Sequence, residues 1–190
     1  MKMLEGIKVL DFTTNASGPK VGTYFADYGA DVIKVEVPGG EGGRKFAFYV
    51  NGISTYACGK DRGKKSIEIK LSDPEAQKLL LEAVKDIDIV LSSNKPGFLE
   101  KFGLGYEDMK KVNPGIIYGA LTPFGYKPNK YSNKPSYDIC AVAMSGINAQ
   151  TGDPDGPPVR IGSVIGDTSG AEAMFAATLL AYIHKLRTGR

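Results

Sequence analysis

The sequence predicts an α/β fold in which an open, Rossmann-like and mostly parallel sheet carries helices on both faces. Strand-like runs alternate with helical stretches along the chain, an order typical of such sheets. The first unit, over residues 7–37, runs strand, helix, strand, which requires a crossover and parallel strands. The 190 residues are 42% hydrophobic and 24% charged, as expected of a single globular domain with a sizeable core.

The first unit also indicates where a ligand would bind. Residues 7–13 form a β-rich alternating run and are expected to be a strand. Small residues turn the chain at 15–19, and the helix that follows closes at Gly29 before a second strand at 31–37. Ligands of parallel sheets bind at the carboxyl ends of the strands, which predicts a site in the loop 13–17.

The middle of the chain continues the alternation. Residues 44–63 show no clear period and are expected to be irregular or a short helix. A third strand at 65–71 is followed by Asp73 and Pro74, an N-cap and a first-turn proline that predict a helix start. The remaining expected elements are strands at 87–91 and 115–121, a short helix from residue 95 and another over 106–112.

The longest apolar helix is predicted near the end of the chain, over residues 171–186, with apolar residues around most of its circumference. Such a helix is expected to be buried. Ser169 and Glu172 fit a capping box at its start. Asp167 would then follow a strand-like run at 160–165 and lie just upstream of the positive helix end, rather than serve as the N-cap itself. A carboxylate there is expected to stay ionised and to act as a nucleophile.

Charge and composition exclude several classes of protein. The net charge of +3 is too small to favour nucleic-acid binding. Charged residues interrupt the N-terminal segment, and the chain has no apolar run of about 18 residues, so we expect neither a signal peptide nor a membrane span. The protein is therefore expected to be cytoplasmic. Cys58 and Cys140 lack metal or disulfide spacing and are expected to be reduced and partly buried, and with a single histidine no metal site is predicted.

Several blocks follow one another over essentially the whole chain: LEGIKVLDFTTNASGP, GADVIKVEVPGG, DRGKKSIEIKL, KPGFLEKFGLGYEDMKKVNPGIIYGALTPFG, PSYDICAVAMSG, TGDPDGPPVRIG, IGDTSG and HKLRTGR. In this order they resemble the N-terminal half of class III CoA-transferases, the group that includes formyl-CoA transferase and carnitine CoA-transferase. The resemblance implies that residues 1–190 are the N-terminal part of the large Rossmann-like domain, incomplete relative to the full-length fold. The second domain and the C-terminal segment that finishes the sheet would then lie outside this sequence.

The resemblance also implies a mechanism. Asp167 would attack an acyl-CoA thioester to give a mixed anhydride, the released CoA thiolate would return to form an enzyme thioester, and an acceptor carboxylate would then take over the CoA. Coenzyme A and acyl-CoA are substrates in this scheme, and no tightly bound cofactor is implied. The implied partners are an acyl-CoA, a small carboxylic acid, and either a second copy in a homodimer or a complementing C-terminal chain.

The same resemblance assigns contacts with coenzyme A to residues at strand ends and in the long loop after residue 121. Val37 and Val142 depart from the family pattern, where arginine and glutamine are usual. Ser72 and Ser93 stand where some members have lysine and asparagine, so the acyl or nucleotide pocket is expected to differ. Arg62 and Lys64 are further sources of positive charge for phosphate groups, unless they are solvated surface residues. The assigned contacts are Asn15, Ala16, Ser17, Ile69, Ser72, Ser93, Asn94, Lys101, Phe102 and Lys134.

Two alternatives stay open beside the CoA-transferase. Related 2-methylacyl-CoA racemases pair the aspartate with a histidine where this chain has Tyr137, so acyl transfer is favoured over proton exchange. The one histidine, His184, is expected only to interact with the carbonyl end of the last helix. The chain could instead be a non-catalytic CoA-binding fragment or subunit that needs a partner chain. A dinucleotide-binding oxidoreductase is disfavoured because no G-x-G-x-x-G follows the first strand.

Overall fold

A parallel sheet forms the centre of the molecule. The computed structural model describes residues 2–46, 48–132 and 134–189. Within these residues five strands form one sheet in the order β5-β2-β1-β6-β7, and every neighbouring pair is parallel. The predicted fold class is therefore confirmed. The strands are β1 (Lys8–Asp11), β2 (Asp31–Glu36), β5 (Lys65–Glu68), β6 (Ile89–Ser92) and β7 (Ile117–Ala120).

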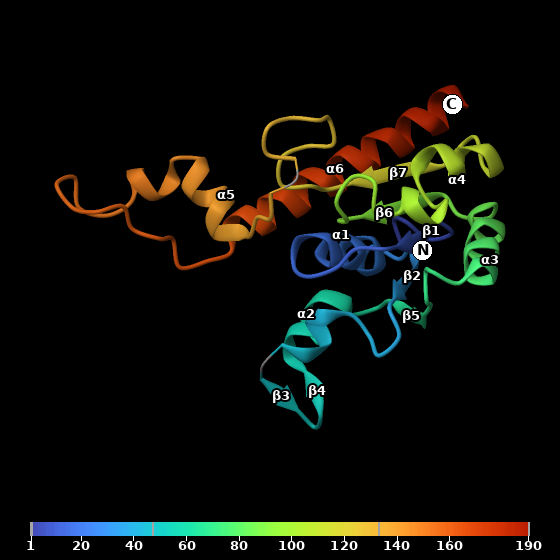
Figure 1. Ribbon diagram of the computed structural model, residues 1–190, viewed down its shortest axis with the longest axis horizontal. Coiled ribbons are helices and arrows are strands. Elements are labelled where there is room, and N and C mark those ends of the chain that lie inside the picture. The colour runs from blue at the N-terminus through green and yellow to red at the C-terminus, as the bar shows by residue number, and fades with distance from the viewer. Residues whose placement is uncertain (1, 47, 133, 190) are drawn as a thin grey trace.

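Helices and one hairpin make up the other regular elements, and Figure 1 shows the last helix running past the sheet. The α-helices are α1 (Ser17–Asp27), α2 (Thr55–Asp61), α3 (Pro74–Val84), α4 (Tyr106–Val112), α5 (Asp138–Met144) and α6 (Ile165–Thr188). The short 3-10 helices are η1 (Gly42–Lys45), η2 (Glu100–Phe102) and η3 (Ile147–Gln150), and the hairpin consists of β3 (Tyr49–Val50) and β4 (Ile53–Ser54).

Each face of the sheet has its own apolar core. Successive side chains of a strand point to opposite faces, and in β1 Val9 joins the core under α1 and α6, where Phe25 is fully buried. Leu10 joins the opposite core, where Leu80 of α3 and Met109 of α4 pack. Helices therefore cover both faces, as predicted.

The strand order reverses at the centre of the sheet. From β1 the chain moves outward to β2 and β5, then crosses back and places β6 on the other side of β1. The loops that leave the carboxyl ends of β1 and β6 consequently diverge, and open sheets bind ligands in the crevice at such a switch point. The loop 13–17, where the sequence predicts a site, is one of these two loops.

The segment 44–63 is more ordered than the sequence suggested. It contains the β3–β4 hairpin and α2. Asn51 and Gly52 form the hairpin turn with φ angles of 51° and 76°, as a two-residue turn with two left-handed positions requires. The Ser54 side chain then caps α2 by accepting a hydrogen bond of 3.3 Å from the Ala57 N–H.

The start of α6 differs from the prediction. The helix begins at Ile165, and no strand is present at 160–165. The Ser169 hydroxyl donates to the carbonyl of Ile165 at 2.7 Å, so it lies within the first turns and does not form the predicted capping box. Asp167 therefore belongs to the first turn of the helix and does not precede it.

The predicted burial of α6 is also wrong for this chain. The helix contacts β7, α1 and α5 on one side. Ala171 and Met174 are buried there, whereas Leu180 and Leu186 are 67% and 68% exposed. The reason lies in the topology, because β7 is an edge strand and the described chain places nothing beyond it.

Two further expectations bear on what the chain can bind. In the described ranges no helix is long and apolar enough to cross a membrane, and no cluster of three or more His, Cys, Asp or Glu could hold a metal. Both cysteines are free. Cys140 is partly buried as expected, whereas Cys58 is exposed on the short helix α2.

Candidate active site

Asp167 lies at the N-terminal end of α6, held by a second carboxylate. Asp138 is buried, with 7% of its surface exposed, and its Oδ1 accepts hydrogen bonds from the N–H groups of Gly166 at 2.8 Å and Asp167 at 3.2 Å. Asp138 thus satisfies two of the N–H groups that a helix start leaves without an intrahelical partner. The backbone of Asp167 is fixed by this contact.

The surroundings of Asp167 raise the pKa of its carboxyl. Burial is the largest cause and the nearby Asp138 carboxylate is the second, while Lys60 and a hydrogen bond from the Ser17 hydroxyl act in the opposite direction. The sequence predicted a carboxylate held firmly in its ionised form by the helix end, but the net shift runs the other way. A carboxylate that is less stabilised is a stronger base and a stronger nucleophile.

A close approach between backbone segments brings α1 to this site. A Cβ built on Gly18 would lie 2.5 Å from the Cβ of Thr13 and 2.8 Å from the Cβ of Ser93. Only glycine permits this approach. The first residue of α1, Ser17, is thereby held between the ends of β1 and β6 and within reach of Asp167.

The predicted coenzyme A contacts at the switch point are brought together. Ser93 Oγ accepts a hydrogen bond of 2.9 Å from the Thr14 N–H, and Asn94 Nδ2 donates to the carbonyl of Phe12 at 3.0 Å. These bonds join the loop after β1, which carries Asn15, Ala16 and Ser17, to the loop after β6. Both loops lie at the carboxyl edge of the sheet, as the sequence predicted.

The remaining predicted contacts are spread along that edge. Ile69 and Ser72 follow β5, which β2 and β1 separate from β6. Ile69 and Phe102 are partly buried and pack against the same core, under α3 and α4. Lys101 and Lys134 are exposed. Among the positions that depart from the family pattern, Val37 is exposed and Val142 is buried.

Lys64 has a structural position that the sequence did not indicate. Its ammonium lies 2.9 Å from Asp11 Oδ2, 2.9 Å from Asp61 Oδ1 and 2.7 Å from the carbonyl of Pro19, with 1% of the side chain exposed. Lys34 lies in the same buried network, 3.3 Å from Asp61. Lys64 is therefore neither a solvated surface residue nor available to a phosphate, and it fixes the loop that precedes α1.

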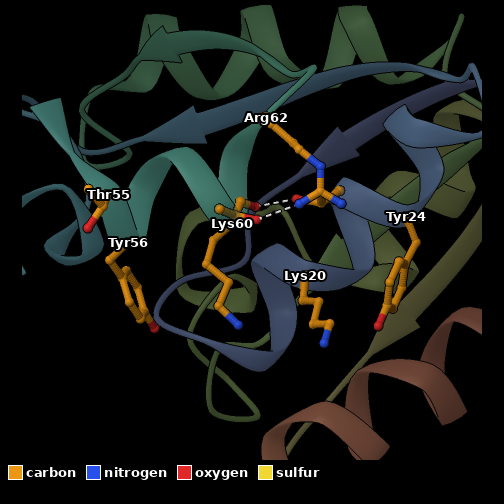
Figure 2. A pocket seen from close by; sticks show the side chains of 8 residues that line it. Lys20, Tyr24, Thr55, Tyr56, Lys60 and Arg62 are labelled. Carbon is orange, nitrogen blue, oxygen red and sulfur yellow. Dashed lines mark hydrogen bonds between the residues drawn. The ribbon is translucent and has the colours of Figure 1, made fainter. Parts of the chain in front are cut away.

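A pocket of about 540 Å³ opens between α1 and α2 (Figure 2). Burial and the charge of Asp167 raise the pKa of Tyr56 to about 12. Burial and the charge of Lys20 lower the pKa of Lys60, whereas Asp167 acts to raise it. The pocket therefore adjoins Asp167. Its lining consists of Lys20, Thr23, Tyr24, Thr55, Tyr56, Gly59, Lys60 and Arg62.

The sequence alone did not identify Lys20, Tyr56, Lys60 and Asp138 as members of the site. One signal was present, since Tyr56 and Lys60 stand four residues apart and share one face if the segment is helical. Arg62, which the sequence offered as a phosphate ligand, instead forms an exposed ion pair with Asp27.

The geometry separates the histidine from the candidate nucleophile. His184 is exposed and lies on the same helix as Asp167, about 25 Å further along its axis at 1.5 Å per residue. Tyr137 is 76% exposed and immediately precedes Asp138. The described residues therefore place no histidine beside Asp167, and a racemase of the kind described above is not favoured.

Comparisons with known proteins agree on one family. The model of CoA-transferase family III matches residues 4–190. Succinyl-CoA:glutarate CoA-transferase of Mus musculus is 38% identical over 100% of the chain and 44% of its own length. Acetyl-CoA:oxalate CoA-transferase of Acetobacter aceti is 37% identical over 98% of the chain and 48% of its own length.

A solved structure, that of a CaiB/BaiF family protein from Brucella suis, is 36% identical and superposes with a TM-score of 0.94. The match covers 100% of the chain and 51% of that protein. The chain thus spans about half the length of the relatives that it matches.

Proposed function

Since the chain belongs to CoA-transferase family III, we propose that it carries the acyl-transfer site of a CoA-transferase, with Asp167 as the nucleophile. The observation that supports this most is the setting of Asp167. A half-buried carboxylate with a raised pKa stands in the first turn of α6, beside the loop at the sheet's switch point. A covalent acyl transfer needs a nucleophile placed in this way.

The reaction can be written with balanced bonds. A carboxylate oxygen of Asp167 attacks the thioester carbonyl, the C–S bond breaks, and CoA leaves as a thiolate from a mixed anhydride. The thiolate then attacks the aspartyl carbon, so that the first acid leaves as a carboxylate and an enzyme thioester forms. The acceptor carboxylate attacks this thioester and again releases the thiolate. The thiolate finally attacks the acceptor's carbonyl carbon, which forms the new acyl-CoA and regenerates Asp167.

The chain's residues contribute to these steps through charge and position. Each addition places negative charge on a former carbonyl oxygen, and the N-terminal end of α6 offers a positive partial charge there. Tyr56, whose pKa is about 12, remains a neutral hydrogen-bond donor at neutral pH. The Ser17 hydroxyl holds the Asp167 carboxylate before attack.

Coenzyme A is proposed to lie in the crevice between β1 and β6. The backbone around Asn15, Ala16 and Ser17 and the side chains of Ser93 and Asn94 border this crevice. The adenosine end would extend along the carboxyl edge toward the outer groups at Ile69, Ser72, Lys101, Phe102 and Lys134. Lys101 and Lys134 are exposed, and in this proposal they bind a phosphate group of coenzyme A.

We further propose that residues 1–190 form the N-terminal part of a large cytoplasmic CoA-transferase domain. In this proposal the sheet edge at β7 is completed by additional chain or by a partner copy. A groove of about 410 Å³ lies between the open edge strand β7 and α6, and small residues such as Ala173, Ala177 and Ala181 line it. Leu180 is 67% exposed and neighbours this groove on the helix surface, three residues after Ala177. An apolar helix face of this kind is typical of an interface.

The proposal is tested by transfer between an acyl-CoA and an isotopically labelled free acid. The sample is the natural polypeptide that contains residues 1–190. Asp167→Asn is expected to reduce exchange by about 10⁴-fold or more, because the covalent route is lost. The matched control is Asp155→Asn, a carboxylate in an exposed turn, which is expected to leave exchange unchanged. Full activity in Asp167→Asn would contradict the proposal.

A further inference from the structure

Two ammonium groups in the pocket between α1 and α2 lack an anionic partner. Lys20 and Lys60 are both partly buried, and among the described residues neither forms an ion pair or hydrogen bond through its ammonium group. Each instead lies over an aromatic ring, Lys20 at 5.6 Å from the centre of Tyr24 and Lys60 at 5.9 Å from the centre of Tyr56. A cation over such a ring is attracted only weakly.

The buried lysines elsewhere in the chain behave differently. Lys34 and Lys64 both contact Asp61, at 3.3 Å and 2.9 Å. Buried charges in proteins are ordinarily paired in this way, because leaving water without a partner is costly. Lys20 and Lys60 are only partly buried and have no such partner among the described residues, so their charges are available to an anionic ligand.

The two ammonium groups also repel one another. Burial and the positive charge of Lys20 together lower the pKa of Lys60. Figure 2 shows the two side chains reaching the same side of the pocket, one from α1 and one from α2. An anion placed between them would turn this repulsion into attraction for both groups.

The rest of the lining suits a small polar ligand. Tyr56 offers a hydroxyl group, whereas the Thr55 hydroxyl donates to the carbonyl of Phe48 at 2.9 Å. Arg62 is already engaged with Asp27, and the Thr23 hydroxyl donates to the carbonyl of Pro19 at 3.1 Å. The charge of a ligand would therefore be met by the two lysines, and a pocket of about 540 Å³ has ample room for a short-chain acid.

Building on the proposed function, we propose that Lys20 and Lys60 bind the second carboxylate of the acyl group, so that the acids transferred at Asp167 are short dicarboxylates. One carboxyl carbon of the acid is the reacting centre at Asp167. The other carboxylate lies between the lysines of the adjoining pocket, with the Tyr56 hydroxyl as a further donor. The site thereby selects its substrate by charge at the end remote from the reaction.

The position of the pocket favours a carboxylate over a phosphate of coenzyme A. Ser17, whose hydroxyl bonds Asp167, stands one turn before Lys20 on α1, and the charge of Asp167 also acts on Lys60 and Tyr56, so the pocket lies near the reacting atoms. The pantetheine arm separates the sulfur of coenzyme A from its phosphates by many bonds. A phosphate group is therefore far from the aspartate when the thioester is in place, whereas the remote carboxylate of a short diacid is near.

The test compares acids that differ only in the second carboxylate. Self-exchange is measured between succinyl-CoA and labelled succinate and between butyryl-CoA and labelled butyrate, with glutarate and valerate as a second pair. The sample is again the natural polypeptide. We expect succinate and glutarate to exchange at least about 10-fold faster, in kcat/KM, than their monoacid counterparts, because hydrogen bonds to charged groups are strong.

Variants then assign this preference to residues. Lys20→Gln and Lys60→Gln are each expected to lower kcat/KM for the diacids about 10- to 100-fold more than for the monoacids. Lys20→Arg is expected to keep the preference. Lys78→Gln, at an exposed position on α3, is the control and should change neither value.

Each other outcome has a defined meaning. Equal loss for diacids and monoacids in both glutamine variants, or no preference for diacids in the unaltered protein, would overturn the proposed pocket while leaving the role of Asp167 intact. A loss that disappears when 3′-dephospho-CoA thioesters are used would show that the lysines bind a phosphate, which would also overturn it. Failure of every acyl-CoA to label Asp167 would instead overturn the proposed function itself.

Discussion

The replacement of Lys64 by methionine distinguishes a buried structural lysine from a phosphate ligand. Lys64 contacts Asp11 and Asp61, whose side chains are 0% and 8% exposed. Methionine retains most of the apolar stem but leaves the two carboxylates facing one another without this ammonium. Removing one partner of a buried ion pair costs about 3 to 5 kcal/mol. Because Lys34 still lies 3.3 Å from Asp61, we expect the lower end, about 3 kcal/mol.

The assay is urea unfolding followed by circular dichroism, with Lys65→Met as the matched control. Lys65 is the adjacent residue and also pairs with an aspartate, Asp31, but its side chain is 68% exposed. Exposed pairs contribute about 0 to 1 kcal/mol, so the control should unfold close to the unaltered protein. Equal free energies of unfolding for the two variants, or a loss of coenzyme A affinity in Lys64→Met without any loss of stability, would refute the structural role of Lys64.

Three further predictions concern carboxyl groups. Asp138→Ala removes the acceptor for the N–H groups of Gly166 and Asp167, so in thermal unfolding it should destabilise the protein by about 1 kcal/mol more than Asp138→Asn. Asp138→Asn should also shift the acidic limb of the pH–rate profile for transfer to lower pH, because the Asp138 charge helps to raise the pKa of Asp167. Because the pKa of Asp167 is raised in the folded state, its ionised carboxylate opposes folding, so Asp167→Asn should have a higher Tm than the unaltered protein at neutral pH. This difference in Tm should disappear below the ordinary pKa of 3.8. An equal Tm for the two proteins at neutral pH would contradict the prediction. Burial opposes the ionisation of Glu36, but hydrogen bonds from Arg44, Ser66 and the backbone lower its pKa to about 2. The resulting stabilisation of the folded protein is fully present above pH 4.5 and is lost as the pH falls toward about 2. Glu36→Gln should therefore remove this part of the acid dependence of the free energy of unfolding.

The sheet was predictable because its signals are local. Alternation in β1 sends Val9 and Leu10 to opposite cores, and the succession of strand and helix required parallel pairing. The start of α3 was equally local. Asp73 accepts a hydrogen bond of 3.0 Å from the Glu75 N–H, and Pro74 takes the first helical position, as predicted.

The start of α6 was not predictable because its cap comes from another part of the chain. Ser169 and Glu172 fit a local capping box, but Asp138, 28 residues before Gly166, binds the helix N–H groups instead. The Ser169 hydroxyl is then free to bond back to the carbonyl of Ile165, as serines within helices often do. A contact over such a sequence distance overrides the local pattern.

The site was predicted in part for the same reason. The loops after β1 and β6 follow from topology, whereas Tyr56 and Lys60 come from a segment in which the hydrophobic period is weak. The Asn51-Gly52 turn was a usable signal there, since this pair favours a two-residue hairpin. The role of Lys64 depends on Asp11 and Asp61 meeting in space, which spacing along the sequence does not reveal.

Covalent trapping identifies the residue that carries coenzyme A during transfer. The protein is incubated with an acyl-CoA, treated with borohydride, which reduces an aspartyl thioester to an alcohol, and analysed by intact mass and peptide mapping. We expect a single modified residue, Asp167, and no modification in Asp167→Asn, while Asp155→Asn is modified like the unaltered protein. Modification at any other carboxylate, or undiminished modification in Asp167→Asn, would contradict the assignment of Asp167 as the nucleophile.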